Sequence, residues 1–161
     1  MAPPFDAGQG FGLDKPGGTA CPNLDCGDRC TIHGARAEQG FGGCIAFDCG
    51  GVGQYVSESL FDGVHWRASA AVRAEMTAAF LALRRVAAVS ELLEAAQALP
   101  LVEADRAAIG RYLERLWPPE GWCQAALLAF DRGPDIGDMH RFLRSLRRYL
   151  ETPGRVEGQA A

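Results

Sequence analysis

The 161-residue chain is long enough for one domain with its own core, or for one domain with a small appendage. Hydrophobic residues make up 48% and charged residues 22% of the chain, and its net charge is −4. These values argue against a disordered chain and against a polycation that coats nucleic acid. The amino-terminal stretch lacks the basic and apolar segments of a secretory signal, and no later stretch approaches the roughly 18 apolar residues of a membrane helix. We therefore expect a soluble cytoplasmic protein with no membrane or nucleic-acid partner.

Two regions without long helices are expected first in chain order. Residues 1–20 contain several prolines and glycines, which predicts an extended leader with little regular structure. Residues 21–63 are again dense in glycine, and this favours a loop that folds closely around a bound group. Within this region, residues 44–47 and 54–61 predict two short strands, and hence a small hairpin.

Four helices are predicted after the turn at residues 62–63, where Ala, Leu, Arg and Glu become frequent. Apolar residues at steps of three and four predict helices that end at prolines or glycines. The third of these segments is nearly all apolar, so we expect it to be buried, including Cys123. The predicted fold is mainly α, with the Cys/Gly-rich region packed on a helical bundle in residues 64–151 and a flexible tail in 152–161. The four helices are expected at residues 68–98, 103–116, 122–130 and 136–150.

The cysteines give the clearest chemical signal. Five of the six lie between residues 21 and 49, and a histidine follows the third of them by three residues. Thiolates a few residues apart can converge on one ion, and soft thiolate ligands favour zinc or an iron-sulfur cluster over magnesium or calcium. The spacing differs from a pair of C-x-x-C motifs and from the common ferredoxin runs, so it leaves zinc and a cluster both open. The candidate ligands are Cys21, Cys26, Cys30, His33, Cys44 and Cys49.

One part of the sequence resembles a known family. The run FGLDKPGGTACPNL, followed by CTIH and GFGGCIAFDCGGVGQ, resembles the cysteine-rich leader domain that precedes the repeats of certain bacterial pentapeptide-repeat proteins. More distantly, the pattern C-x-x-L, C-x-I-H and a later cysteine is similar to the zinc- or iron-chelating cysteine-cluster (YkgJ-like) family. These families usually carry an upstream group of cysteines, which is absent before Cys21, and no pentapeptide repeats follow here. The resemblance runs through residue 54 and implies a metal- or cluster-binding module, with matching positions at Cys21, Cys30, His33, Cys44 and Cys49.

The sequence therefore favours a small metal-binding protein that holds zinc or an iron-sulfur cluster. It would serve as a structural element, an interaction module or an electron-transfer module. We expect the ligands to be Cys21, Cys30, Cys44 and Cys49, with Cys26 and His33 as alternates.

Two other functions remain open at this stage. A thiol/disulfide redox protein or sensor would form a reversible disulfide between Cys44 and Cys49 or between Cys26 and Cys30. A helical adaptor would instead bind a partner protein through its helical region. The chain contains no GxSxG, HExxH or P-loop pattern and nominates no general acid, base or nucleophile, so we do not expect an enzyme.

Overall fold

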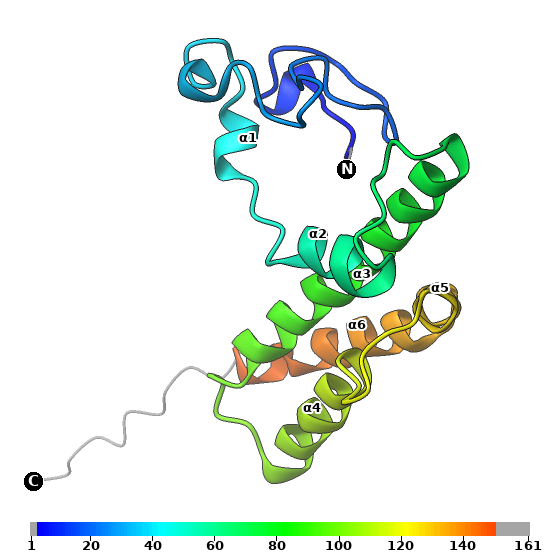
Figure 1. The fold of residues 1–161 in the computed structure, drawn as a ribbon. Coiled ribbons are helices and arrows are strands. Elements are labelled where there is room, and N and C mark those ends of the chain that lie inside the picture. Colours follow the sequence, from blue (N-terminus) through cyan, green and yellow to red (C-terminus); the bar gives the residue numbers. More distant parts are fainter. Residues whose placement is uncertain (1–2, 151–161) are drawn as a thin grey trace, which may run out of the picture. The chain divides into compact units, whose positions relative to one another are not determined.

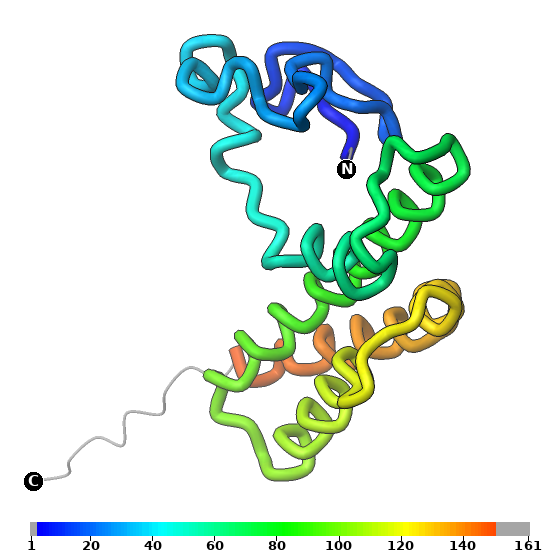
Figure 2. Tube along the Cα trace, in the orientation of Figure 1, coloured from blue at the N-terminus to red at the C-terminus, as the bar shows by residue number. Residues whose placement is uncertain are grey.

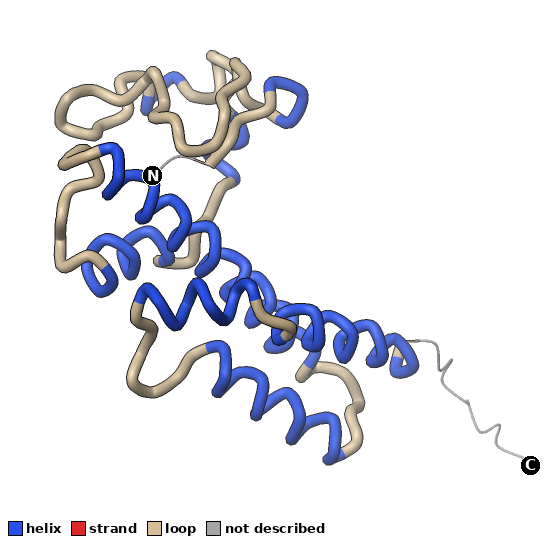
Figure 3. The backbone as a smooth tube through the Cα atoms, turned by 90° about the vertical axis from the view of Figure 1, so that its right-hand side faces the viewer, coloured by secondary structure: helices blue, strands red, loops and turns tan. Residues whose placement is uncertain are grey.

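The computed structural model describes residues 3–150 (Figure 1). The chain divides into two compact units, Met1–Leu81 and Ala82–Ala161. The fold is mainly helical, as the sequence predicts. Across residues 3–150 there is no strand, and the only β pairing consists of two isolated bridges (Figure 3). The predicted flexible tail, 152–161, lies outside the described residues. None of the described helices is both long and apolar enough to cross a membrane.

The leader folds back on itself, whereas the sequence predicts an extended segment (Figure 2). Phe5 and Lys15 exchange two backbone hydrogen bonds, of 2.9 and 3.1 Å, and close a loop that contains the short helix η1 (Ala7–Gln9). The ring of Phe5 stacks on that of Phe11 with centroids 4.4 Å apart, and the buried Phe41 meets Phe5 edge-on. This aromatic cluster gives a glycine-rich segment a small core of its own.

Short helices follow the leader, where the sequence predicts a hairpin. They are η2 (His33–Ala35), α1 (Gly42–Ala46), α2 (Val52–Gln54) and the π-helical turn η3 (Tyr55–Leu60). The predicted strands at 44–47 and 54–61 are therefore wrong. Val52 and Val56 are both buried, whereas Gln54 between them is exposed. A strand would place all three side chains on one face, so this burial pattern fits a helix.

Helix α3 (Ala70–Ala96) begins where Ser69 accepts a hydrogen bond from the backbone N–H of Val72, as an N-terminal cap. It ends before Pro100, close to the predicted range of 68–98. Its buried residues recur at steps of three and four, so one face of the helix is apolar along its length. The residues at these steps are Met76, Phe80, Leu83, Val86, Ser90 and Leu93, and the smaller Ala79, Ala82, Ala87 and Val89 are buried beside them.

The second unit contains α4 (Glu103–Leu116), α5 (Gln124–Arg132), α6 (Asp135–Ser145) and the 3-10 turn η4 (Leu146–Tyr149). The bounds of α4 agree with the prediction, and α5 and α6 differ from it at their ends. The expectation that the third predicted segment is buried is wrong, because only Leu127 of α5 is buried and Cys123 is exposed. The core of this unit is formed mainly by Leu83, Val86, Leu93, Ile109, Leu116, Leu127, Met139 and Leu146.

Candidate metal site

A tight loop carries two of the candidate cysteines. The bridge between Leu24 and Cys30 closes this loop, which contains Cys26. The Asp25 carboxylate accepts hydrogen bonds from the backbone N–H groups of Gly27 and Arg29, at 2.8 and 2.9 Å. The N–H of Arg29 lowers the pKa of that carboxyl, so Asp25 remains charged and keeps the turn closed.

Arg67, which precedes α3 in the same unit, stabilises this loop. Its guanidinium donates to the backbone carbonyls of Asp25 and Cys26, at 3.1 and 3.2 Å, and lies 2.8 Å from Oδ1 of Asp28. That oxygen is buried and accepts no hydrogen bond, so Arg67 stabilises it through charge alone. Asp28 has a φ of 59°, which a residue other than glycine rarely adopts. The loop is therefore held in an unusual conformation by contacts from a distant part of the chain.

His65 completes this arrangement and is not available as a metal ligand. Its Nε2 lies 2.7 Å from Oδ2 of Asp28, and its Nδ1 accepts the backbone N–H of Arg67 at 3.1 Å. Because Nδ1 is an acceptor, the ring proton is on Nε2 and is donated to Asp28. Both ring nitrogens are thus engaged within the protein, and His65 can serve neither as a ligand nor as a base for a thiol.

Three candidate thiols from separate segments lie close together. Cys21 follows the leader, Cys30 ends the tight loop and Cys44 lies in α1, and all three are half-buried free thiols. Burial raises the pKa of Cys44, and the charges of Cys21 and Cys30 raise it further, whereas the positive charge of Arg36 lowers it. An electrostatic effect of this kind requires neighbouring groups, so the fold brings these three thiols into one neighbourhood.

These thiols are near one another without being in ligand contact. Among residues 3–150, no three His, Cys, Asp or Glu side chains are arranged to hold a metal ion. The charges of thiols affect one another over several ångströms, whereas zinc–sulfur bonds are about 2.3 Å long. Thiols can therefore influence one another's pKa without being placed as ligands. The arrangement is that of free thiols in which Cys21 and Cys30 lie within electrostatic range of Cys44.

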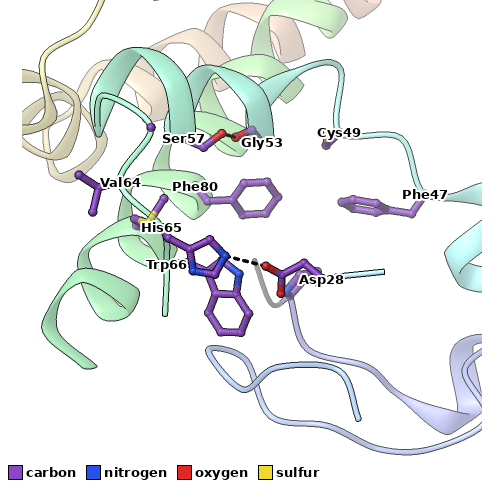
Figure 4. A pocket seen from close by; sticks show the side chains of 12 residues that line it. Asp28, Phe47, Cys49, Gly53, Ser57, Val64, His65, Trp66 and Phe80 are labelled. Carbon is purple, nitrogen blue, oxygen red and sulfur yellow. Dashed lines mark hydrogen bonds and ion pairs between the residues drawn. The ribbon is translucent and has the colours of Figure 1, made fainter. Parts of the chain in front are cut away.

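The remaining predicted ligands occupy different positions. Cys49 lines a cavity of about 440 Å³ together with Asp28, Phe47 and His65, and none of the three grouped thiols lines it (Figure 4). Cys26 is exposed, and its backbone carbonyl accepts a hydrogen bond from the Arg67 guanidinium. His33 is exposed at the start of η2, where its carbonyl accepts a hydrogen bond from Arg36. Of the predicted set, the fold groups Cys21, Cys30 and Cys44.

Sequence reasoning did not find Lys15 and Arg67, which the structure places beside the cysteines. Lys15 is the only lysine in the chain, and this could have singled it out. Arg67 carries no such signal, because it is separated from Cys26 by 41 positions and its role depends on the folded chain.

Comparisons with known proteins add little to this description. No family model matches the chain, and no solved structure matches it. It is similar to the uncharacterized protein YybG of Bacillus subtilis (strain 168), with 44% identity over 69 residues. The matched segment covers 43% of this chain and 25% of YybG, so the chain spans about a quarter of the length of that relative.

Proposed function

We propose that residues 21–49 bind zinc or an iron-sulfur cluster through Cys21, Cys30, Cys44 and Cys49, with Cys26 and His33 as alternate ligands. The observation that carries this proposal is the grouping of Cys21, Cys30 and Cys44 from three separate segments of the chain. Three thiols provide most of a four-coordinate site, and one further ligand completes it.

The donor set suits these metals. Thiolates are soft anionic ligands, and both zinc and iron-sulfur clusters are commonly held by four of them. Arg36 and Lys15 act electrostatically on Cys44 and Cys21 respectively, so positive charge accompanies the thiols. With zinc, the group would tie together segments that have little core of their own, and with a cluster it would supply electron transfer.

A movement of the chain after α1 would bring Cys49 to the site. It lies five residues beyond Cys44, in the non-helical segment between α1 and α2. Gly50 and Gly51 follow it with positive φ values of 57° and 77°, a backbone conformation that glycine adopts without strain. Binding of the metal would draw Cys49 away from its cavity, or would use Cys26 or His33 in its place.

The resemblance to the cysteine-rich leader domain of pentapeptide-repeat proteins, and to the YkgJ-like family, supports the same proposal. Cys21, Cys30, His33, Cys44 and Cys49 are the positions that match. We also propose a cytoplasmic location, because thiols that bind metal must remain reduced.

A thiol redox role is the alternative that the same geometry favours. All six cysteines are free thiols, and three of them are neighbours. An adaptor role has weaker support. Leu92 and Val102 are exposed large apolar residues of the helical region, but single exposed apolar residues are ordinary on a protein surface.

Cysteine variants of the full chain, purified without oxygen, test the proposal. We expect the wild-type protein to contain zinc, or iron with acid-labile sulfide, and Cys44→Ser to lose most of it. Cys123→Ser is the matched control, since Cys123 is exposed and lies in the second unit. Equal metal content in wild-type protein and the Cys44→Ser variant would exclude Cys44 as a ligand. A metal-free wild-type protein that forms an intramolecular disulfide on mild oxidation would favour the redox role instead.

A further inference from the structure

Lys15 has an unusual position for a lysine. Every other basic residue apart from the histidines is an arginine, so Lys15 is the only lysine of the chain. It is nevertheless buried, with 5% of its surface exposed. Lysine is among the residue types least often buried, and it is buried only where its charge has partners.

The ammonium group of Lys15 is held by backbone carbonyls. Nζ donates to the carbonyl oxygens of Pro3, Thr19 and Pro16, at 2.5, 3.0 and 3.4 Å, and lies 4.5 Å from the centre of the Phe5 ring. An ammonium can direct three protons to acceptors around a single point, whereas the planar guanidinium of arginine presents its donors in a flat fork. The site therefore suits a lysine and not an arginine.

These contacts lead directly to the cysteine group. Thr19 is two residues before Cys21, so the hydrogen bond to its carbonyl fixes the backbone that carries this thiol. Burial lowers the pKa of Lys15, and the negative charge of Cys21 acts in the opposite direction, which makes the two groups electrostatic neighbours.

The same lysine is connected to Cys44 through the aromatic cluster. Phe5, beneath the ammonium, stacks on Phe11, and a Cβ added to Gly43 would lie 2.6 Å from the Phe11 ring. The backbone N–H of Gly43 also donates to the carbonyl of Gly10 at 2.7 Å. The leader that Lys15 holds closed thus packs against the residue that precedes Cys44.

We propose that Lys15 is a positioning residue of the cysteine site. Its ammonium fixes the leader at the Thr19 carbonyl, presents Cys21 toward Cys30 and Cys44, and places a positive charge beside the thiolates that bind the metal. This inference rests on the proposed metal-binding function. It assigns Lys15 no direct bond to the metal.

The test compares the affinity of the full chain for Zn²⁺ in wild-type protein and three variants, by competition with a chromophoric chelator. Lys15→Met removes the charge and the hydrogen bonds, and Lys15→Arg keeps only the charge. Arg73→Met is the control, because it removes an exposed cation from the same unit. We expect Lys15→Met to bind Zn²⁺ at least tenfold more weakly, Lys15→Arg to be intermediate, and Arg73→Met to be unchanged.

Co²⁺ provides a readout that a merely structural role would not change. Its absorption reports the number and geometry of bound thiolates, and we expect the sulfur-to-cobalt band of Lys15→Met to be weaker than that of wild-type protein at saturation. Wild-type Zn²⁺ affinity and an unchanged Co²⁺ spectrum in Lys15→Met would overturn the inference while leaving the metal-binding function intact. A wild-type protein that binds neither ion would remove the proposed function and the inference together.

If Lys15→Met does not fold, amine labelling of wild-type protein decides the question. Because Lys15 is the only lysine, an amine-reactive acetylating reagent has a single side-chain target. We expect its modification, followed by mass spectrometry, to be at least tenfold slower with Zn²⁺ bound than after chelation. Equal rates in the two states would overturn the inference.

Discussion

Replacing Arg67 by alanine should loosen the loop that carries Cys26 and Cys30 without unfolding the protein. The substitution removes two hydrogen bonds to backbone carbonyls, at 3.1 and 3.2 Å, and leaves the buried Oδ1 of Asp28 without its neighbouring cation. Each hydrogen bond contributes about 0.5–1.5 kcal/mol. The ion pair adds less than about 1 kcal/mol, because both side chains are about one third exposed. We therefore expect the loop to lose about 2 kcal/mol of local stability.

Amide hydrogen exchange on the metal-free protein measures this loss directly. The N–H of Thr31 donates to the carbonyl of Asn23 at 2.8 Å, and the N–H of Asp25 donates to that of Arg29 at 3.0 Å, so both report opening of the loop. A loss of about 2 kcal/mol should speed their exchange roughly 30-fold in Arg67→Ala. Amides in α4, which belongs to the second unit, should be unaffected.

Arg67→Lys is the matched control for charge. Its ammonium can still neutralise Asp28, but it cannot place donors on both carbonyls at once, so we expect an intermediate acceleration. The reasoning is refuted if the amides of Thr31 and Asp25 exchange less than about threefold faster in Arg67→Ala, since that corresponds to under about 0.7 kcal/mol.

Two further substitutions test other parts of the account. Gly43→Ala places a Cβ 2.6 Å from the Phe11 ring, and this overpacking should destabilise the first unit by about 1–3 kcal/mol in thermal unfolding followed by circular dichroism. Gly42→Ala is its control, because no atom lies within 4 Å of the added Cβ, and an equal loss in both variants would contradict the packing argument. The hydrogen bond from Tyr149 lowers the pKa of Asp105 below its ordinary value of 3.8. The stability from this contact is therefore complete above about pH 3.8 and is lost as the pH falls through the lower folded-state pKa of Asp105. Asp105→Asn should accordingly make the free energy of unfolding less dependent on pH at the acid end. An unchanged pH dependence would contradict this argument.

The helices of the second unit were the part of the fold that sequence could predict. The segment that forms α4 has apolar residues on one face and a Trp-Pro-Pro stop, and both signals are local. The apolar composition of α5 gave the wrong exposure for Cys123, because that residue precedes the helix as its cap and does not lie on its buried face. Local composition therefore predicted the helices better than their buried faces.

The first unit shows why the rest could not be predicted. Residues 54–61 contain several β-favouring side chains, yet Val52 and Val56 are buried while Gln54 between them is exposed, which fits a helix and not a strand. The spacing of the cysteines predicts a metal site in this segment, but it could not say which thiols are neighbours. That depends on the leader, which Lys15 closes by a hydrogen bond to the Pro3 carbonyl, and on the loop, which Arg67 holds from 41 positions away.

Metal binding by the grouped thiols is tested most directly in wild-type protein purified without oxygen. Thiol protection is mapped and the metal content is measured on the same sample. Alkylation before and after chelation, followed by mass spectrometry, reports each cysteine separately. We predict bound zinc or iron, with Cys21, Cys30 and Cys44 protected until the metal is removed, together with Cys49 or an alternate ligand. Cys123 should react equally in both states, because it is exposed in the second unit. A metal-free protein in which all six cysteines react alike before and after chelation would contradict the account.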